Sequence, residues 1–173
     1  MKCTDLLTQD HKIILRGLDV LSQMARDAER HRPPEAVDVE ALLRFFRSFA
    51  DDHHQLKEES ALFPELLRSY CGQEASLRHM LFEHEQERSL VEALEDALRT
   101  KQVADFVYFA GRFVDLIRTH IHKEDRILFQ IVEAALSAEQ DAKVVEEFGK
   151  FEVDQSLLGD LRKLEWKYLR KAA

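Results

Sequence analysis

Ten residues of this chain occur twice in nearly the same form. Residues 54–63 read HQLKEESALF, and residues 120–129 read HIHKEDRILF. Both copies have a His, two variable residues, Lys, Glu, a second acid, two variable residues, Leu and Phe. A histidine and a glutamate four residues apart lie on one face of a helix, about one turn from each other. Two copies of the motif can therefore bring two imidazoles and two carboxylates into one bundle interior, an arrangement typical of a metal site.

The sequence between these motifs favours long helices, because 173 residues contain only five Gly and three Pro. Apolar residues recur at helical spacing in four long segments, which predicts a helix in each. The first runs from about Thr4, a predicted N-cap, to Arg30. The other three cover about residues 37–70, 73–99 and 102–136. Pro64 should kink the second helix one turn past Glu58, and Gly72 should cap its C-terminal end.

Two further helices are predicted after the fourth segment. Ser137 and Gln140 have the spacing of a capping box, which opens a fifth helix. The last helix has an apolar stripe, namely Leu157, Leu161, Leu164 and Tyr168. We expect an all-α protein with an up-down-up-down four-helix bundle over residues 1–136. The extra C-terminal helices, residues 137–173, should pack on the outside of that bundle.

Charge and composition narrow the classes of partner. The formal net charge is −8, whereas nucleic-acid and anionic-membrane surfaces need a basic footprint. Apolar runs are shorter than the roughly 20 residues that cross a bilayer, and acidic residues interrupt the N-terminus where a signal peptide would be apolar. The two cysteines, Cys3 and Cys71, are too few for a disulfide framework, and we interpret them as reduced thiols. We therefore expect a cytoplasmic protein with neither nucleic acid nor membrane as a partner.

Two more histidines extend the repeat. The first and third helical segments each contain an acid followed by a histidine on the apolar stripe, Asp10-His11 and Glu83-His84. The order along the chain is thus acid-His, His-x-x-Lys-Glu, acid-His, His-x-x-Lys-Glu. This order predicts a helical hairpin used twice, with His11 and His54 opposite His84 and His120. Each half then contributes two imidazoles and one carboxylate.

These side chains suit a pair of transition-metal ions. Imidazole nitrogen suits iron, zinc, manganese or copper, and carboxylates can bridge two divalent ions inside a bundle. One histidine on an apolar stripe is more often a core residue than a ligand, and one glutamate is usually half of a solvated pair with a nearby Lys. Four stripe histidines, two of them with Glu one turn later, favour a metal site. Their neighbours Lys57, Lys123, Glu59, Asp10 and Glu83 point away from the interior and are interpreted as surface groups or as groups supporting the ligands.

The chain resembles the hemerythrin-like (HHE cation-binding) family over residues 4 to about 136. The resemblance rests on Asp10-His11, on His54 through Pro64, on Met80 through His84 and on His120 through Asp125. It implies a four-helix bundle with a non-haem di-iron centre that binds O2 or related small ligands. The resemblance further implies His11 and His54 on one iron, His84 and His120 on the other, and Glu58 as a bridge.

Two positions depart from the oxygen-carrying members of that family. Those carriers have a His-x-x-x-His pair on the third helix, and here the first position is Met80. Their second bridging acid stands five residues after its histidine, which points to Asp125, whereas the internal repeat points to Glu124. We favour Glu124, since a spacing of four keeps it on the face of His120. His79 lies one position off the face of Met80, and His53 and His122 are interpreted as exposed or supporting groups.

Three functions compete at this stage. The first is a di-iron protein that binds or senses O2, NO or peroxide, with zinc or manganese as the other candidate metals. The second is an enzyme, either a di-iron oxidase or peroxide-handling enzyme, or an iron storage or repair protein. The motifs offer this reading little support, because the tyrosine Tyr108 lies 12 residues before His120. The third is an interaction module that forms a homodimer or binds a protein partner through the C-terminal helix.

Overall fold

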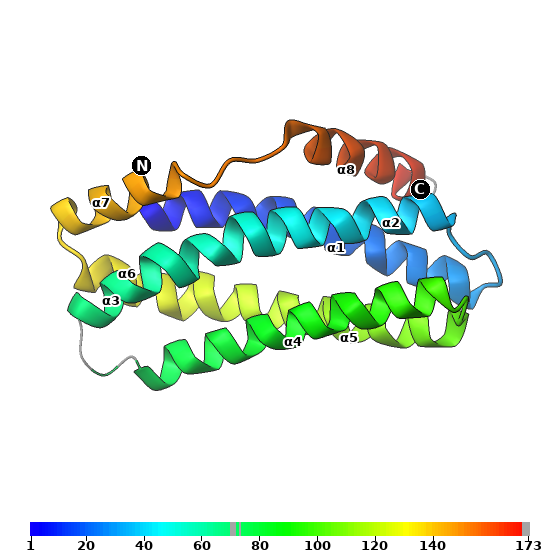
Figure 1. Ribbon diagram of the computed structural model, residues 1–173, viewed down its shortest axis with the longest axis horizontal. Helices are drawn as coiled ribbons and strands as arrows, with labels where there is room; N and C mark the ends of the chain where they lie inside the picture. The colour runs from blue at the N-terminus through cyan, green and yellow to red at the C-terminus, as the bar shows by residue number, and fades with distance from the viewer. Residues whose placement is uncertain (70–71, 73, 171–173) are drawn as a thin grey trace.

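The computed structural model describes residues 1–69, 72 and 74–170. Its described residues form helices and their connections, as the all-α prediction requires, and Figure 1 shows long helices lying side by side. The end of the second predicted helix at Tyr70 and Cys71 lies outside the described residues, while Gly72 has a positive φ of 123°. Within the described part of the chain, no helix combines the length and the apolar character needed to cross a membrane.

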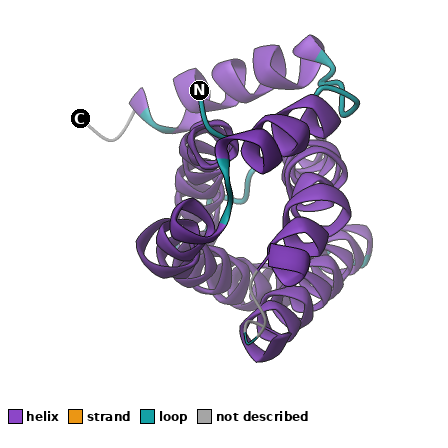
Figure 2. Cartoon of the chain, turned by 90° about the vertical axis from the view of Figure 1, so that its left-hand side faces the viewer, coloured by secondary structure: helices purple, strands orange, loops and turns teal. Residues whose placement is uncertain are grey.

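Four helical rods alternate in direction and enclose a shared interior (Figures 1 and 2). The first rod is α1 (Cys3–Glu29) and the third is α4 (Glu74–Arg99). The second rod consists of α2 (Ala36–Phe45), η1 (Phe46–Gln55), η2 (Glu58–Leu62) and α3 (Phe63–Ser69), and the fourth of α5 (Val103–Lys123), η3 (Glu124–Leu128) and α6 (Phe129–Ala135). Here η denotes a π-helical stretch. The up-down-up-down bundle is therefore confirmed. The predicted N-cap at Thr4 was wrong, because α1 begins at Cys3 and Lys2 is its N-cap. The Lys2 amide donates a hydrogen bond of 2.8 Å to the Asp5 carboxylate.

Two of the three π-helical stretches in the described residues, η2 and η3, interrupt the second and fourth rods at equivalent places. One runs from Glu58 to Leu62 and another from Glu124 to Leu128, so each starts at the glutamate of a repeated motif. Pro64 follows the first stretch, but the second has no proline behind it. Proline alone therefore does not explain the wider turns. Such turns often occur at functional sites, where they change the direction of side chains.

Two apolar clusters fill the bundle, one toward each end. The larger contains the buried aromatic residues Phe45, Phe46, Phe49 and Phe113 together with aliphatic residues of all four rods. The smaller contains Leu7, Leu62, Phe63, Met80 and Phe129 among others. Along each rod, the histidine and glutamate residues predicted to bind metal lie between the residues of these two clusters. The bundle thus has a polar layer between two apolar ones, and the apolar clusters keep water from that layer.

The C-terminal helices pack on the outside of the bundle. Helix α7 (Ala138–Phe148) begins with the predicted capping box, and its Val144 and Phe148 are buried in the smaller cluster. Helix α8 (Gln155–Tyr168) crosses α1 and α2 (Figure 1) and buries its apolar stripe of Leu157, Leu161, Leu164 and Tyr168. The stripe therefore packs on its own bundle. A boundary at residue 136 and a partner for the C-terminal helix stay predictions.

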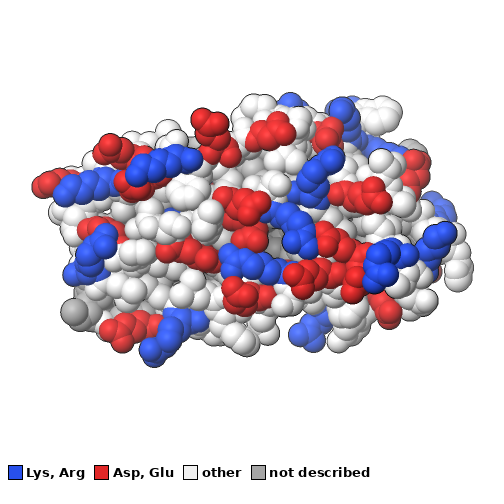
Figure 3. Space-filling model, in the orientation of Figure 1, with Lys and Arg blue, Asp and Glu red and all other residues white. Residues whose placement is uncertain are grey.

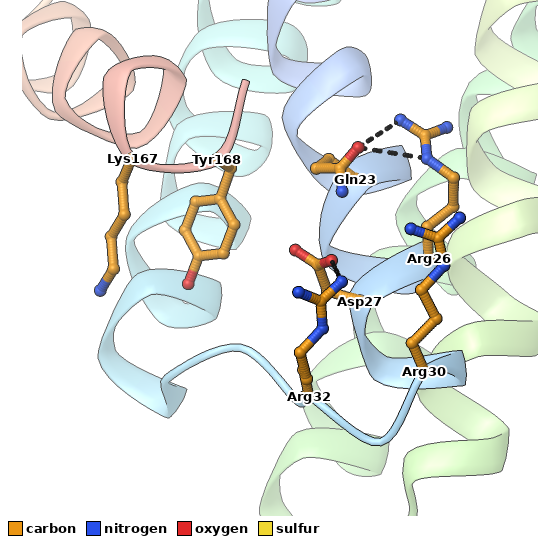
Figure 4. Close-up of a pocket in the computed structure, with 7 residues that line it drawn as sticks. All are labelled: Gln23, Arg26, Asp27, Arg30, Arg32, Lys167 and Tyr168. Atoms are coloured by element: carbon orange, nitrogen blue, oxygen red, sulfur yellow. Dashed lines mark hydrogen bonds and ion pairs between the residues drawn. The ribbon is translucent and has the colours of Figure 1, made fainter. Parts of the chain in front are cut away.

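A cleft of about 570 Å³ lies where α8 meets the C-terminal end of α1 (Figure 4). Arg26 and Arg30 lie at that end of α1, where exposed carbonyl groups favour cations. Arg32 pairs with Asp27 at 3.0 Å. Arg26 and Arg30 therefore lie where their positive charges stabilise the C-terminal end of α1. Elsewhere, acidic and basic side chains are interspersed on the face seen in Figure 3.

Candidate metal centre

Six predicted side chains converge in the polar layer of the bundle. His11, His54, Glu58 and Glu124 place one ligand atom each within 4.8 Å of one another, and so do Glu58, His84, His120 and Glu124. The two groups share both glutamates. Each of these six residues is at most 3% exposed. The sequence grouped His11 with His54 and His84 with His120, and the structure brings these pairs together.

All four rods contribute side chains to the cluster. Helix α1 carries His11, η1 and η2 carry His54 and Glu58, α4 carries His84, and α5 and η3 carry His120 and Glu124. The Nε2 atoms of His11 and His54 are 3.1 Å apart, as are those of His84 and His120. The carboxylate of Glu124 lies 3.2 Å from His11 and 3.1 Å from His120. That of Glu58 lies 3.8 Å from His54 and 3.5 Å from His84.

The outer nitrogen of each histidine faces a second carboxylate. The Nδ1 atoms of His11, His84 and His120 lie 2.8, 2.7 and 2.8 Å from Asp125, Glu59 and Glu83. The fourth pair, His54 Nδ1 and Asp10, is looser at 3.5 Å. A carboxylate at Nδ1 holds the proton on that nitrogen and leaves the Nε2 lone pair directed inward. Asp125, Glu59 and Glu83 therefore orient three of the imidazoles, whereas His54 Nδ1 has no hydrogen-bond partner among the described residues.

The two lysines of the repeat hold two of these acids. Lys57 donates to Asp10 at 2.9 Å, and Lys123 makes the equivalent contact with Glu83. Lys57 also lies 2.5 Å from His53 Nε2, and both are buried. Burial raises the pKa of the Glu83 carboxyl, but hydrogen bonds from His120 and Lys123 outweigh it and lower the pKa to about 2. The pKa of Asp10 is lowered in the same way, because contacts with His53 and His54 outweigh its burial.

The histidines have different proton affinities. Burial lowers the pKa of His11, but hydrogen bonds to Asp125 and Glu124 outweigh it and raise the pKa to about 9. Burial opposes protonation of His120 too, yet the charge of Glu124 raises its pKa well above the ordinary value. His54 behaves in the opposite way, since burial lowers its pKa to about 4. Protons on His11 and His120 thus balance the negative charge of Glu124.

The two central glutamates also differ. Burial raises the pKa of Glu58 well above its usual range, and the negative charge of Glu124 adds to that shift. Burial acts on Glu124 too, but the positive charges of His120 and His11 lower its pKa well below the usual range. Without a cation, two buried carboxylates this close cannot both be charged, so Glu58 holds a proton and Glu124 does not.

These features fit a pair of metal cations. Both carboxylate oxygens of Glu58 and of Glu124 are buried and, apart from the histidine contacts given above, have no hydrogen-bond partner among the described residues. Such groups are costly to bury unless they bind a cation. The Nε2 atoms of each histidine pair face each other at 3.1 Å, and two inward lone pairs at that distance repel unless a cation or proton lies between them. Imidazole and carboxylate together suit transition metals.

The remaining predicted residues lie outside the cluster. Asp125 is on the outer side of His11 and is 32% exposed at its side chain, so the geometry favours Glu124 for the central position. His122 is exposed, and His79 is 56% exposed beside Glu83. Met80 lies in the smaller apolar cluster. On the fourth rod, Glu124 therefore faces both histidine pairs and Asp125 does not.

Two polar residues beside the cluster escaped sequence analysis. Glu87 and Gln55 are each 4% exposed, and the Gln55 amide donates a hydrogen bond to Glu87. Burial raises the pKa of Glu87, and the nearby charges of His120, His84 and Glu124 also act on it. Its spacing was a usable signal, because the buried residues Met80, His84, Glu87, Val91 and Leu94 recur every three or four positions along α4. Gln55 had no such signal, since it adjoins His54.

Comparison with known proteins agrees with this geometry. The family model of the hemerythrin HHE cation-binding domain matches residues 3–132 of the chain. No curated protein and no solved structure matches the chain significantly. The matched residues include all six side chains of the cluster and end before α7.

Proposed function

The chain belongs to the hemerythrin HHE cation-binding domain family, and on that premise we propose that it holds a non-haem di-iron centre which binds O2, NO or peroxide. His11 and His54 would hold one ion, His84 and His120 the other, and Glu58 and Glu124 would bridge them. One observation carries the proposal, namely the two buried groups of possible ligands that share both glutamates. A metal pair in this place would supply redox chemistry and open coordination positions for a small ligand.

The choice of iron rests on the chemistry of the proposed ligands. Imidazole and carboxylate side chains suit iron, manganese and zinc alike. Zinc has no redox chemistry, whereas iron or manganese could react with O2 or peroxide.

Two histidines and two shared carboxylates leave coordination positions open on each ion. At the position where oxygen carriers have a further histidine, this chain has Met80, which is buried in the smaller apolar cluster. Its counterpart in the other half of the repeat is Leu7, also buried there. Both ions would therefore have the same number of protein ligands. A cytoplasmic location, predicted from the sequence, belongs to this proposal as well.

Metal analysis of the protein purified from its native host tests the proposal. We expect about two irons per chain, an absorption band in the visible range after exposure to O2, and its change on adding NO under anaerobic conditions. Protein that contains neither iron nor manganese, and stays colourless after iron reconstitution, would rule the proposal out. An enzymatic function, the second interpretation, would require turnover of peroxide or of Fe(II) beyond one equivalent.

A further inference from the structure

The two halves of the repeat differ at one pair of positions beside the metal centre. Aligning Asp10-His11 with Glu83-His84 places Ile14 on Glu87, and aligning the two His-x-x-Lys-Glu motifs places Ile121 on Gln55. Ile14 and Ile121 are buried in the larger apolar cluster. The same pair of positions is thus apolar between α1 and α5, and is a hydrogen-bonded amide and acid between η1 and α4.

A small cavity adjoins this polar pair. It has a volume of about 20 Å³ and lies between η1, α4 and α5. Half of its lining residues are apolar, with Ala50, Val91 and Phe113 among them, and the ion pair of Arg88 with Asp51 lines it as well. Because one water molecule needs about 10–15 Å³ measured in this way, the cavity has room for one small molecule.

Two polar atoms beside the cavity have no hydrogen-bond partner among the described residues. They are Gln55 Oε1 and Glu87 Oε1. The Gln55 amide nitrogen donates to the other oxygen of Glu87, and in this arrangement Oε1 is the free end of the amide. Gln55 Oε1 can only accept a hydrogen bond. A buried acceptor without a donor is costly, so the pair calls for a molecule that carries a proton on oxygen or nitrogen.

We propose that Gln55 and Glu87 form a subsite for hydrogen peroxide beside the metal centre, where peroxide exchanges with a water molecule. O2 and NO have no proton to donate and would leave Gln55 Oε1 unpaired. Water and hydrogen peroxide both donate and accept, so they match Glu87 whether or not it is protonated. The inference rests on the proposed function and deepens it, because it selects peroxide from the three ligands named there.

A titration of zinc-loaded protein with hydrogen peroxide tests the subsite without turnover, because zinc has no redox chemistry. The readout is the NMR signal of the Gln55 side-chain amide, with the zinc content measured in parallel. We expect a saturable shift in the wild type and an apparent Kd at least about tenfold weaker in Glu87→Ile, the residue of the other half, since each lost hydrogen bond contributes roughly that factor. Glu85→Gln, an exposed acid on the same helix, should bind like the wild type.

Ala50→Val provides a second test, because it narrows the cavity and leaves both polar residues in place. It should also weaken peroxide binding about tenfold. Full zinc content with no saturable shift in the wild type would mean that the cavity holds only a structural water, and would overturn the subsite alone. An unchanged Kd in either zinc-loaded variant would overturn it too. Protein that binds no metal would instead overturn the proposed function, and the subsite with it.

Nitric oxide separates the subsite from general support of the centre. In reduced, iron-loaded protein, NO binding should stay within about threefold of the wild type in Ala50→Val, because this substitution narrows the cavity and changes none of the six side chains of the cluster. An equal loss of NO and peroxide binding in Ala50→Val would assign the effect to the integrity of the centre and would overturn the selectivity for a hydrogen-bond donor.

Discussion

The Nδ1 atom of His120 lies 2.8 Å from the Glu83 carboxylate, whose other oxygen contacts the ammonium of Lys123. His120 and Lys123 belong to one copy of the repeated motif and Glu83 to the acid-His pair before it. The other half of the molecule repeats the arrangement, more loosely, with His54, Lys57 and Asp10. The motif therefore encodes the orientation of its histidine as well as the ligands themselves.

Replacing Glu83 should weaken metal binding although the residue lies outside the cluster. Glu83→Gln removes the negative charge that holds the Nδ1 proton of His120 and pairs with Lys123, and loss of such a partner typically costs 10–100-fold in metal affinity. Competition with a chelator measures the change. Glu85→Gln, an exposed acid two residues later, is the matched control. Equal affinities for the two variants would show that the Glu83–His120 contact does not support the centre.

The histidines of the repeat should differ sharply from their neighbours. His54→Ala and His120→Ala each remove an imidazole from the cluster and leave a buried carboxylate without its partner. We expect metal content to fall from about two ions per chain to one or fewer, because unpaired buried charges are strongly unfavourable. His122→Ala changes an exposed side chain and should leave metal content unchanged. A comparable loss in His122→Ala would contradict the assignment of the inward face.

Much of the bundle could be predicted because its signals are local. Helical spacing, the Ser137 capping box and the two copies of the motif each depend on residues a few positions apart. The choice between Glu124 and Asp125 was harder, because neighbouring positions differ by about 100° around an α-helix and η3 is a π-helical stretch that changes this angle. The structure places Glu124 inside and Asp125 on the outer side of His11.

Contacts between the two halves of the repeat could not be predicted from the sequence. Glu59 reaches His84 and Asp125 reaches His11 across the bundle, and such pairing depends on how the rods pack. Glu87 could have been found from its spacing alone. It was missed because an acid after a histidine on α4 is easily assigned to the solvated face.

Metal affinity should rise with pH between about 6.5 and 9. In the metal-free protein the pKa of His11 is about 9 and that of His120 is raised as well, so both must release a proton before they bind a cation. Each released proton contributes up to about tenfold in affinity per pH unit. Chelator competition at several pH values measures the slope. A flat profile over this range would mean that neither histidine is protonated in the metal-free state.

The stability of the metal-free protein should change in the opposite direction. His11 has a pKa of about 9 in the folded chain, above its ordinary value near 6.5. The stabilisation from its protonated form is complete below pH 6.5 and is lost as the pH rises toward 9. The raised pKa values of His120 and Glu58 act in the same direction. Tm of chelated protein should therefore fall over this range, by about 2–4 °C for each kcal/mol lost.

Glu58→Gln should separate metal binding from folding. Without a cation Glu58 is protonated, and Gln has nearly the same shape and is also neutral. The free energy of unfolding of the metal-free protein should therefore stay within about 1 kcal/mol of the wild type. Metal content should fall below half, because one of the two shared carboxylates is lost. Denaturant unfolding with and without metal measures both effects, and full metal content would exclude Glu58 as a bridge.

The contact between Tyr168 and Asp38 should decide how firmly α8 is held on the bundle. The Tyr168 hydroxyl donates to Asp38 at 2.6 Å, and Lys167 contacts the same carboxylate at 2.5 Å. Tyr168→Phe should cost about 2 kcal/mol of unfolding free energy, because it removes one hydrogen bond to a charged group and leaves the buried stripe intact. Truncation before Asp154 removes the whole stripe and exposes the apolar surface beneath it, so we expect a destabilised or misfolded monomer on size exclusion. A stable monomer that forms from a wild-type dimer would instead show that α8 mediates association between copies, since the bundle would then not need the helix to fold.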